Sequence, residues 1–373
     1  MFKVCRVLLT ANSEPLTAAI VYYTMNESVF LQACRREPTA YTPVWLMRQA
    51  GRYMAEYRAL RERVPFLTLC KTPDLAAQVT VEAVQRLGVD AAIIFADILL
   101  IVEPMGVGLE FSQGDGPVIH RPVRAGADVD KLREDDPRET VPFVFEAVRK
   151  ARAGLPAYIP LIGFSGAPFT VASYMIEGSG SKNYIETKRL MYNDPGAWRA
   201  LMERLVRIIT AYVNAQIVAG AQAVQLFDSW IGCLSPSDYR TFILPHMKTL
   251  FAGITPGTPV IHFGTDTSGL LDLMAEAGGT VLGIDWRIDL DVAWRRIGYD
   301  RAVQGNLDPV TLFASLDEIR RQVRRILDMA QGRPGHIFNL GHGILPQTPV
   351  ENVIALVEMV HEISEELRVE NEK

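Results

Sequence analysis

The sequence predicts a (β/α)8 barrel that forms a single domain. Eight short apolar segments, rich in β-branched residues, recur along the chain. Amphipathic stretches separate these segments, and several of them begin at or beside a proline, which is a helix-start signal. The chain has 373 residues, of which 49% are hydrophobic, so it can bury one large core. A doubly wound sheet normally uses fewer than eight strands, which favours the barrel.

The eight predicted strands each end in small or polar residues. They are residues 44–47, 91–96, 159–163, 222–227, 258–263, 280–284, 302–305 and 335–340. The predicted helices include residues 73–87, 142–153, 195–219, 236–251, 312–331 and 349–367. The segment from Gly106 to Arg124 is expected to form a hairpin that turns at Gly114-Asp115-Gly116.

The two ends of the chain are expected to lie outside the barrel domain, which we place at residues 25–368. Residues 1–24 contain an apolar run that is too brief for a signal peptide, so we predict a disordered extension and no secretion. A mis-assigned start would also explain this segment. The acidic tail, residues 369–373, is expected to fray.

Composition excludes several classes of protein. Lys and Arg number 38 against 43 Asp and Glu, a net charge of −5, and no basic run suits nucleic acid. The apolar stretch from Ala91 to Val102 is interrupted by Asp97 and is too short to span a membrane. The four cysteines form no C-x-x-C pair, so neither disulfides nor a zinc ribbon is indicated and the cytoplasm is the expected location.

The first predicted strand leads directly into Arg48-Gln49-Ala50-Gly51-Arg52. Two guanidiniums around a glycine suit the recognition of carboxylates or phosphates. An isolated pair of this kind is more often a surface pair, here with Glu56 and Glu62. Because reactive groups in barrels follow the strand ends, the position of the motif favours binding.

Other strand ends carry further polar groups. Asp97 follows the second strand, where it either faces a ligand or caps the next turn; the apolar residues after it favour a ligand. Tyr174 follows a glycine-rich, aromatic segment after the third strand, Ser229 follows the fourth, and His342 lies between two glycines after the eighth. No zinc-binding H-x-x-x-H or H-E-x-x-H pattern occurs, and we predict no metal.

Several long segments resemble the uroporphyrinogen decarboxylase family. They are PVWLMRQAGRYMAEYRA, GFSGAPFTVASYMIEGSGSK, QLFDSWIGCLSP, QGNLDP and FNLGHGILPQTP, and the resemblance runs from about residue 25 almost to the end. It implies a homodimeric (β/α)8 barrel without metal or organic cofactor. Such an enzyme converts the four acetate side chains of uroporphyrinogen to methyls, giving coproporphyrinogen and four CO2 in haem biosynthesis.

The resemblance also implies roles for individual residues. Arg48, Gln49, Ala50, Gly51 and Arg52 would bind substrate carboxylates. Asp97 would face the pyrrole N–H groups, with Tyr174, Ser229 and His342 completing the site and Ile93, Phe164 and Phe227 forming an apolar wall. We expect Asp97 to stabilise a cationic intermediate, and the proton donor remains open among Arg48, Tyr174 and His342. Two residues depart from the family pattern, Ala55 and Asp266.

Two alternatives remain. A zinc-dependent methyltransferase of the corrinoid or coenzyme M type would share the barrel, but it needs an H-x-C pair where this chain has His262-Phe263-Gly264. A non-catalytic tetrapyrrole-binding protein would share the pocket, but the presence of Asp97 with both arginines argues against it.

Overall fold

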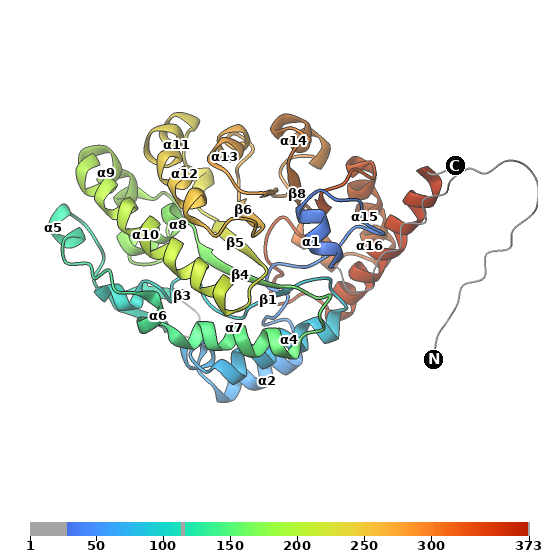
Figure 1. The fold of residues 1–373 in the computed structure, drawn as a ribbon, viewed down its shortest axis with the longest axis horizontal. Helices are drawn as coiled ribbons and strands as arrows, with labels where there is room; N and C mark the ends of the chain where they lie inside the picture. The colour runs from blue at the N-terminus through green and yellow to red at the C-terminus, as the bar shows by residue number, and fades with distance from the viewer. Residues whose placement is uncertain (1–27, 113–115, 372–373) are drawn as a thin grey trace, which may run out of the picture.

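The computed structural model describes residues 28–112 and 116–371. Its centre is a curled sheet of seven parallel strands, and helices cover the outside of this sheet (Figure 1). In their order across the sheet, the strands are β1 (Ala92–Ile93), β4 (Leu161–Gly166), β5 (Ala223–Asp228), β6 (Val260–Gly264), β7 (Val281–Gly283), β8 (Ala302–Gln304) and β9 (His336–Ile337). Each pairs with the next strand of the sheet along the chain, so their carboxyl ends share one edge.

The first predicted strand is reduced to a single bridge. Val44 pairs in parallel with Phe338, beyond β9, and its carbonyl accepts a hydrogen bond from the Asp90 N–H, before β1, at 2.8 Å. The Val44 backbone therefore links the two edge strands of the sheet. The strand does not continue beyond Trp45 because the N–H groups of Leu46 and Met47 donate to the side-chain oxygens of Gln49 and Asn339. The structure confirms the α/β fold with a curled parallel sheet and shortens this strand.

Three hydrogen-bonded polar side chains lie in the interior of the curled sheet. The Trp45 indole N–H donates to Gln304 Oε1 at 2.8 Å, and Gln304 Nε2 donates to Gln225 Oε1 at 3.1 Å. All three side chains are buried. The strands read as continuous apolar runs because both of their faces are covered, by this interior on one side and by helices on the other.

The helices follow the predicted pattern. The longer ones are α4 (Pro73–Leu87), α7 (Pro142–Gly154), α8 (Pro168–Glu177), α10 (Pro195–Ala219), α12 (Leu244–Gly253), α15 (Leu316–Ala330) and α16 (Val350–Asn371). The shorter ones are α1 (Val29–Cys34), α2 (Ala55–Arg63), α3 (Phe66–Cys70), α5 (Gly126–Val129), α6 (Pro137–Thr140), α9 (Ile185–Asn193), α11 (Pro236–Phe242), α13 (Leu271–Ala277) and α14 (Leu290–Ile297). Single turns occur at η1 (Glu103–Val107), η2 (Ile231–Cys233) and η3 (Pro309–Phe313).

One predicted helix is divided. Residues 236–251 form α11 and α12, with a break at Ile243, whose φ of −122° is not helical. Pro245 explains the break, because proline lacks an N–H and its ring clashes with the carbonyl four residues earlier in a helix.

The predicted hairpin is confirmed. Strands β2 (Leu109–Ser112) and β3 (Gly116–Ile119) pair antiparallel, while Gly114 and Asp115 of the expected turn lie outside the described residues. The hairpin is attached to the end of α8, because the Ile119 N–H donates a hydrogen bond to the carbonyl of Gly178, the residue after this helix, at 2.7 Å.

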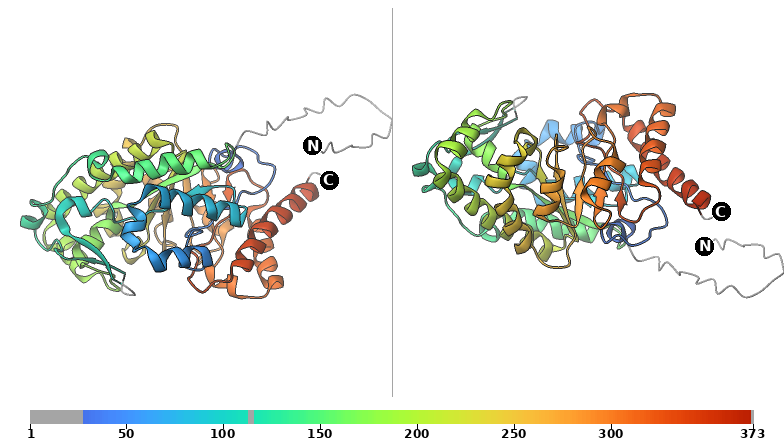
Figure 2. Two further views of the ribbon diagram at one scale, coloured as in Figure 1. Left: turned by 90° about the horizontal axis from the view of Figure 1, so that it is seen from below. Right: turned by 90° about the horizontal axis from the view of Figure 1, so that it is seen from above.

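The C-terminal helix is longer than predicted. Helices α15 and α16 lie side by side (Figure 2), and Arg324 forms ion pairs with Glu366 at 3.3 Å and Glu370 at 3.1 Å. These pairs explain why α16 continues to Asn371, so residues 369–371 are helical where fraying was expected. The predicted extension of residues 1–24 lies outside the described residues. None of the helices in the described part of the chain combines the length and apolar character that a membrane crossing requires.

Candidate active site

The polar residues singled out in the sequence meet at the carboxyl ends of the strands. Arg48 follows the Val44 bridge, Asp97 follows β1, Tyr174 lies on α8 beyond β4, Ser229 follows β5, and His342 follows β9. Arg48 contacts Gly343, the residue after His342, and the charges of Arg48 and Asp97 each influence the pKa of the other group and that of Tyr174, which indicates that these side chains share one region.

The backbone of Arg48 adopts an unusual conformation. A turn is closed by the hydrogen bond from the Gln49 N–H to the Leu46 carbonyl at 2.9 Å, and Arg48 is its third residue, with a φ of +64°. Glycine is favoured at such a position, since a side chain at positive φ is strained. Residues held in this way cluster at functional sites, where the geometry of the side chain matters more than the strain.

The side chain of Arg48 lies across Gly343. A Cβ on Gly343 would overlap with Cδ of Arg48 and lie 2.7 Å from its Cγ. The two loops are also joined by the hydrogen bond from the Ile344 N–H to the Met47 carbonyl at 2.9 Å. The Arg48 side chain thus passes close to the backbone of Gly343, as the glycines on both sides of His342 predicted, and this close approach explains the glycine.

Both guanidiniums of the motif are available. In residues 28–112 and 116–371, neither Arg48 nor Arg52 has a side-chain hydrogen bond or ion pair, so the pairing with Glu56 and Glu62 is not observed. Loss of hydration and the nearby charge of Arg52 lower the pKa of Arg48. Two neighbouring guanidiniums without a hydrogen-bonded partner in the described residues favour a ligand with carboxylates.

Asp97 combines the two roles that were alternatives in the sequence. Its Oδ1 accepts a hydrogen bond from the Leu99 N–H at 2.8 Å, so it does cap the turn after β1. Burial raises its pKa to about 6, while the Leu99 N–H and the charge of Arg48 oppose this shift. Near neutral pH the carboxylate is therefore mostly ionised but poorly solvated.

His342 is a neutral hydrogen-bond donor. Burial and the charge of Arg48 lower its pKa to about 4. Its Nδ1 accepts the Gly343 N–H at 2.7 Å, which assigns the hydrogen of the neutral ring to Nε2. The imidazole can thus donate a hydrogen bond from Nε2, but it carries no proton to release as an imidazolium near pH 7.

Tyr174 is held by an aromatic stack. Its ring centroid lies 3.8 Å from that of Trp230 at an interplanar angle of 29°, and the Tyr184 ring meets the same indole edge to face with centroids 5.3 Å apart. Burial and the Asp97 charge raise the pKa of Tyr174 to about 12. The phenol is therefore a hydrogen-bond donor with a fixed ring orientation.

The expected apolar residues lie on the inner face of the sheet. Phe164 and Phe227 meet edge to face with centroids 5.5 Å apart, and Phe227 meets Phe263 in the same way at 6.1 Å. Ile93 is buried and pairs with Ile162, two residues before Phe164, so it lies on the same face.

The remaining residues of the motif shape the loop. Gln49 is buried, accepting from the Leu46 N–H at 3.1 Å and donating to the Ala91 carbonyl at 3.1 Å, so its amide holds the loop to the sheet. Ala50 and Gly51 are half-buried, and a Cβ on Gly51 would lie 2.9 Å from the Arg48 carbonyl oxygen. Ser229 is half-buried, with its own carbonyl accepting from the Thr265 hydroxyl.

Sequence reasoning missed residues that the structure adds. Trp230 stacks on Tyr174, and Arg287, beyond β7, acts electrostatically on His342. The strand-end rule that selected Asp97 could have found both, because Trp230 is the second residue after β5 and Arg287 the fourth after β7.

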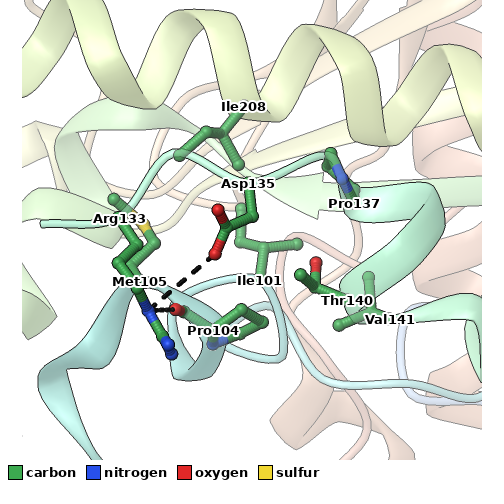
Figure 3. A pocket seen from close by; sticks show the side chains of 9 residues that line it. All are labelled: Ile101, Pro104, Met105, Arg133, Asp135, Pro137, Thr140, Val141 and Ile208. Atoms are coloured by element: carbon green, nitrogen blue, oxygen red, sulfur yellow. Dashed lines mark hydrogen bonds and ion pairs between the residues drawn. The ribbon is translucent and has the colours of Figure 1, made fainter.

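Other parts of the described structure do not resemble this site. No group of three or more His, Cys, Asp or Glu side chains in the described residues is placed to hold a metal ion. His262 lies in β6, where its Nε2 is 3.8 Å from Asp228 Oδ2, and Gly264 stands where a zinc methyltransferase would need a cysteine. A small pocket between η1 and α10 (Figure 3) contains none of the strand-end residues, and Arg133 there donates to the Pro104 carbonyl at 2.8 Å.

The chain matches known proteins over most of its length. Residues 25–363 match the family model described as uroporphyrinogen decarboxylase. A uroporphyrinogen decarboxylase of Carboxydothermus hydrogenoformans is 58% identical over 91% of this chain and 97% of its own length. One of Sorangium cellulosum is 56% identical over 90% and 96%. A solved methyltransferase from Methanosarcina mazei shares the fold, with a TM-score of 0.75 at 21% identity over 89% of this chain and 97% of its own. The chain belongs to the uroporphyrinogen decarboxylase family.

Proposed function

We propose that the protein removes CO2 from the four acetate side chains of uroporphyrinogen and gives coproporphyrinogen, without a metal or organic cofactor. Family membership supports the reaction class, that of a carboxy-lyase acting on uroporphyrinogen in haem biosynthesis. The observation that carries the proposal is a poorly solvated carboxylate, Asp97, coupled to the unpaired guanidinium of Arg48 at the carboxyl ends of the strands.

The reaction needs an electron sink. When CO2 leaves an acetate on a pyrrole, the electron pair of the broken C–C bond remains on the ring substituent, and a neutral electron-rich pyrrole cannot accept it. Protonation of a ring carbon makes a pyrrolium cation, which accepts the pair as an exocyclic methylene. A second proton then converts this methylene to the methyl group, and loss of the first proton from the ring carbon restores the aromatic pyrrole, so each acetate carboxylate consumes one proton overall.

Asp97 is proposed to stabilise the pyrrolium. Its carboxylate would accept hydrogen bonds from the pyrrole N–H groups and gain more attraction when the ring becomes cationic. A fixed charge in a poorly solvated site favours the cation over the neutral substrate without solvent reorganisation. The hydrogen bond from the Leu99 N–H holds this carboxylate in place.

The pKa shifts argue against His342 and Tyr174 as the source of the first proton. The imidazole of His342 is neutral near pH 7, and the pKa of Tyr174 is raised to about 12, away from proton release. Arg48 is the remaining candidate; lost hydration and Arg52 lower its pKa, although a guanidinium stays protonated near pH 7. His342 and Tyr174 would instead donate hydrogen bonds to the substrate, with Ser229 beside them and Ile93, Phe164 and Phe227 as the apolar wall.

Carboxylate recognition is proposed for the loop of residues 48–52. Arg48 and Arg52 would bind side-chain carboxylates of the substrate, while Gln49, Ala50 and Gly51 shape the loop that presents them. The absence of an ion pair on either guanidinium in the described structure supports this, because neither must give up an internal partner to bind the substrate.

Anaerobic incubation with uroporphyrinogen tests the function. The expected result is stepwise appearance of intermediates with seven, six and five carboxylates, ending at coproporphyrinogen with four CO2 released per substrate. Methyl transfer that depends on added zinc would identify the methyltransferase alternative instead. Tight binding of the tetrapyrrole without CO2 release would identify a non-catalytic binding protein.

We further propose that the protein works as a homodimer in the cytoplasm, on the strength of the family resemblance. Light scattering coupled to size-exclusion chromatography measures the assembly directly. Because the chain has a mass of 41.5 kDa, a dimer elutes with about twice that mass, and elution at the mass of one chain would contradict the proposal.

A further inference from the structure

The loop after β7 brings a third guanidinium to the site. This loop contains Asp285, Trp286 and Arg287, directly beyond the buried Ile284. It contacts the loop of His342, since a Cβ on Gly341 would overlap with the backbone nitrogen of Trp286. The loop after β7 and the loop that carries His342 therefore contribute to the same surface.

A buried carboxylate fixes Arg287. Asp285 is only 1% exposed, and it accepts the Arg287 backbone N–H at 3.1 Å and Nη1 of the same residue at 2.6 Å. Asp285 also accepts a hydrogen bond from the backbone N–H of Asp266, at 2.5 Å. One nitrogen of the guanidinium is thereby anchored, and Nε and Nη2 stay available for a ligand.

The indole of Trp286 sets the plane of the guanidinium. Arg287 Cζ lies 4.0 Å from the centroid of this ring, a cation–π contact. The same indole meets the His342 ring edge to face at 6.5 Å. Arg287 and Arg48 both lower the pKa of His342, so the imidazole lies near two guanidiniums that reach it from different loops.

We propose that Arg287 is a further substrate-binding residue, which holds a carboxylate of the tetrapyrrole at a place separated from Arg48 by His342. This inference rests on the proposed function, because it assumes a ligand with many carboxylates. Such a ligand exceeds what Arg48 and Arg52 can bind with two guanidiniums. An anchored and stacked guanidinium loses little entropy when it binds a carboxylate, which suits this role.

Removing the charge of Asp266 should change substrate binding in the opposite direction to removing that of Arg287. Its carboxylate is 4.0 Å from Arg287 Nε and its side chain is 71% exposed, so it competes with a bound carboxylate for the same charge. If Arg287 binds substrate, Asp266→Asn should strengthen binding. If Arg287 only stabilises the loop, loss of Asp266 should weaken the loop and leave binding unchanged or weaker.

The experiment compares Arg287→Gln, Arg287→Lys and Asp266→Asn with the unaltered protein. Arg295→Gln is the matched control, because Arg295 is an exposed arginine on α14 that pairs with Asp291 at 2.9 Å. KM for uroporphyrinogen is measured over a range of salt concentrations, and the Kd of uroporphyrin, the oxidised octacarboxylate, is measured by fluorescence. Thermal melts confirm that each variant is folded.

We expect Arg287→Gln to raise both KM and Kd about tenfold and to flatten their salt dependence, since one charged hydrogen-bonded contact is lost. Arg287→Lys should keep the salt dependence of the unaltered protein, and Arg295→Gln should change neither constant. An unchanged KM and Kd in Arg287→Gln, or unchanged or weaker binding in Asp266→Asn, would overturn the inference. Because the Kd of uroporphyrin does not depend on turnover, a protein that binds through Arg287 but releases no CO2 would overturn the proposed function alone.

Discussion

Asp97 shows how one residue serves both the fold and the site. Its side chain caps the turn after β1 through the Leu99 N–H, a role that asparagine could also fill. The charge is what asparagine lacks, and burial makes this charge costly, as the raised pKa shows. A costly charge that the fold does not need for its hydrogen bond indicates a functional requirement.

Replacing Asp97 by Asn should therefore stabilise the protein at neutral pH. The pKa of the carboxyl rises from 3.8 to about 6 on folding, so the native state binds the proton more tightly and stability falls as pH rises between these values. Above pH 6 the full penalty is present, and Asp97→Asn should raise the free energy of unfolding by about 1 to 3 kcal/mol. The difference should shrink towards pH 4.

Urea denaturation at pH 7.5 and pH 4.5 measures this effect. Asp97→Asn keeps an oxygen for the Leu99 N–H, so the cap is preserved and the comparison isolates the charge. A variant less stable than the unaltered protein at pH 7.5 would show that the carboxylate is a structural group.

The sequence identified individual site residues where their position after a strand was enough to select them. Arg48, Asp97 and His342 were identified because each follows a strand end, and these ends meet. The protonation of His342 could not be predicted, since it depends on burial and on Arg48, almost 300 residues away in the sequence. Arg287 also follows a strand end, but its anchoring by Asp285 and its stacking on Trp286 become visible only in the folded loop.

At the scale of elements, the strands and long helices were predictable because each carries its own pattern. Proline marks the starts of α4, α7 and α10, and both bounds of α4 and α10 agree with the prediction. The first strand was overestimated, because its N–H groups after Trp45 bond to the Gln49 and Asn339 side chains rather than to a strand. Such partners from distant segments leave no pattern in the local sequence.

The contact between two loops makes a prediction at this scale. Gly343→Ala places a methyl group against Cγ and Cδ of Arg48 and should displace that guanidinium. We expect KM for uroporphyrinogen to rise about tenfold or more, with the melting temperature lowered only slightly, because the overlap is with a flexible side chain.

Gly196→Ala is the control for this substitution. A Cβ there would have an ordinary contact of 3.5 Å, with Asp194 Oδ1, in the first turn of α10. Steady-state kinetics on both variants decide the matter, and an unchanged KM in Gly343→Ala would show that the position of Arg48 does not control substrate binding.

At the scale of the whole molecule, a net negative charge coexists with a group of arginines at the candidate site. The protein carries a net charge of −5, whereas Arg48, Arg52 and Arg287 lie among the strand ends. A substrate with many carboxylates is repelled by the molecule as a whole and attracted by this surface. Arg48 and Arg52, which have no hydrogen-bonded partner in the described residues, supply this attraction.

Salt should therefore weaken substrate binding. Mobile ions screen charges over about 10 Å at 0.1 M, so we expect KM to rise several-fold between about 0.05 and 0.5 M salt. Steady-state assays at constant pH check this, with a neutral osmolyte at matched osmolarity as the control. A KM independent of salt would contradict binding through these guanidiniums.

The central claim is that the Asp97 carboxylate stabilises a cation formed from the substrate, and the turnover number of Asp97→Asn tests it most directly. The account predicts that kcat for uroporphyrinogen decarboxylation falls by about 100-fold or more, in a variant that is folded and still binds uroporphyrin. A kcat close to that of the unaltered protein would contradict the claim.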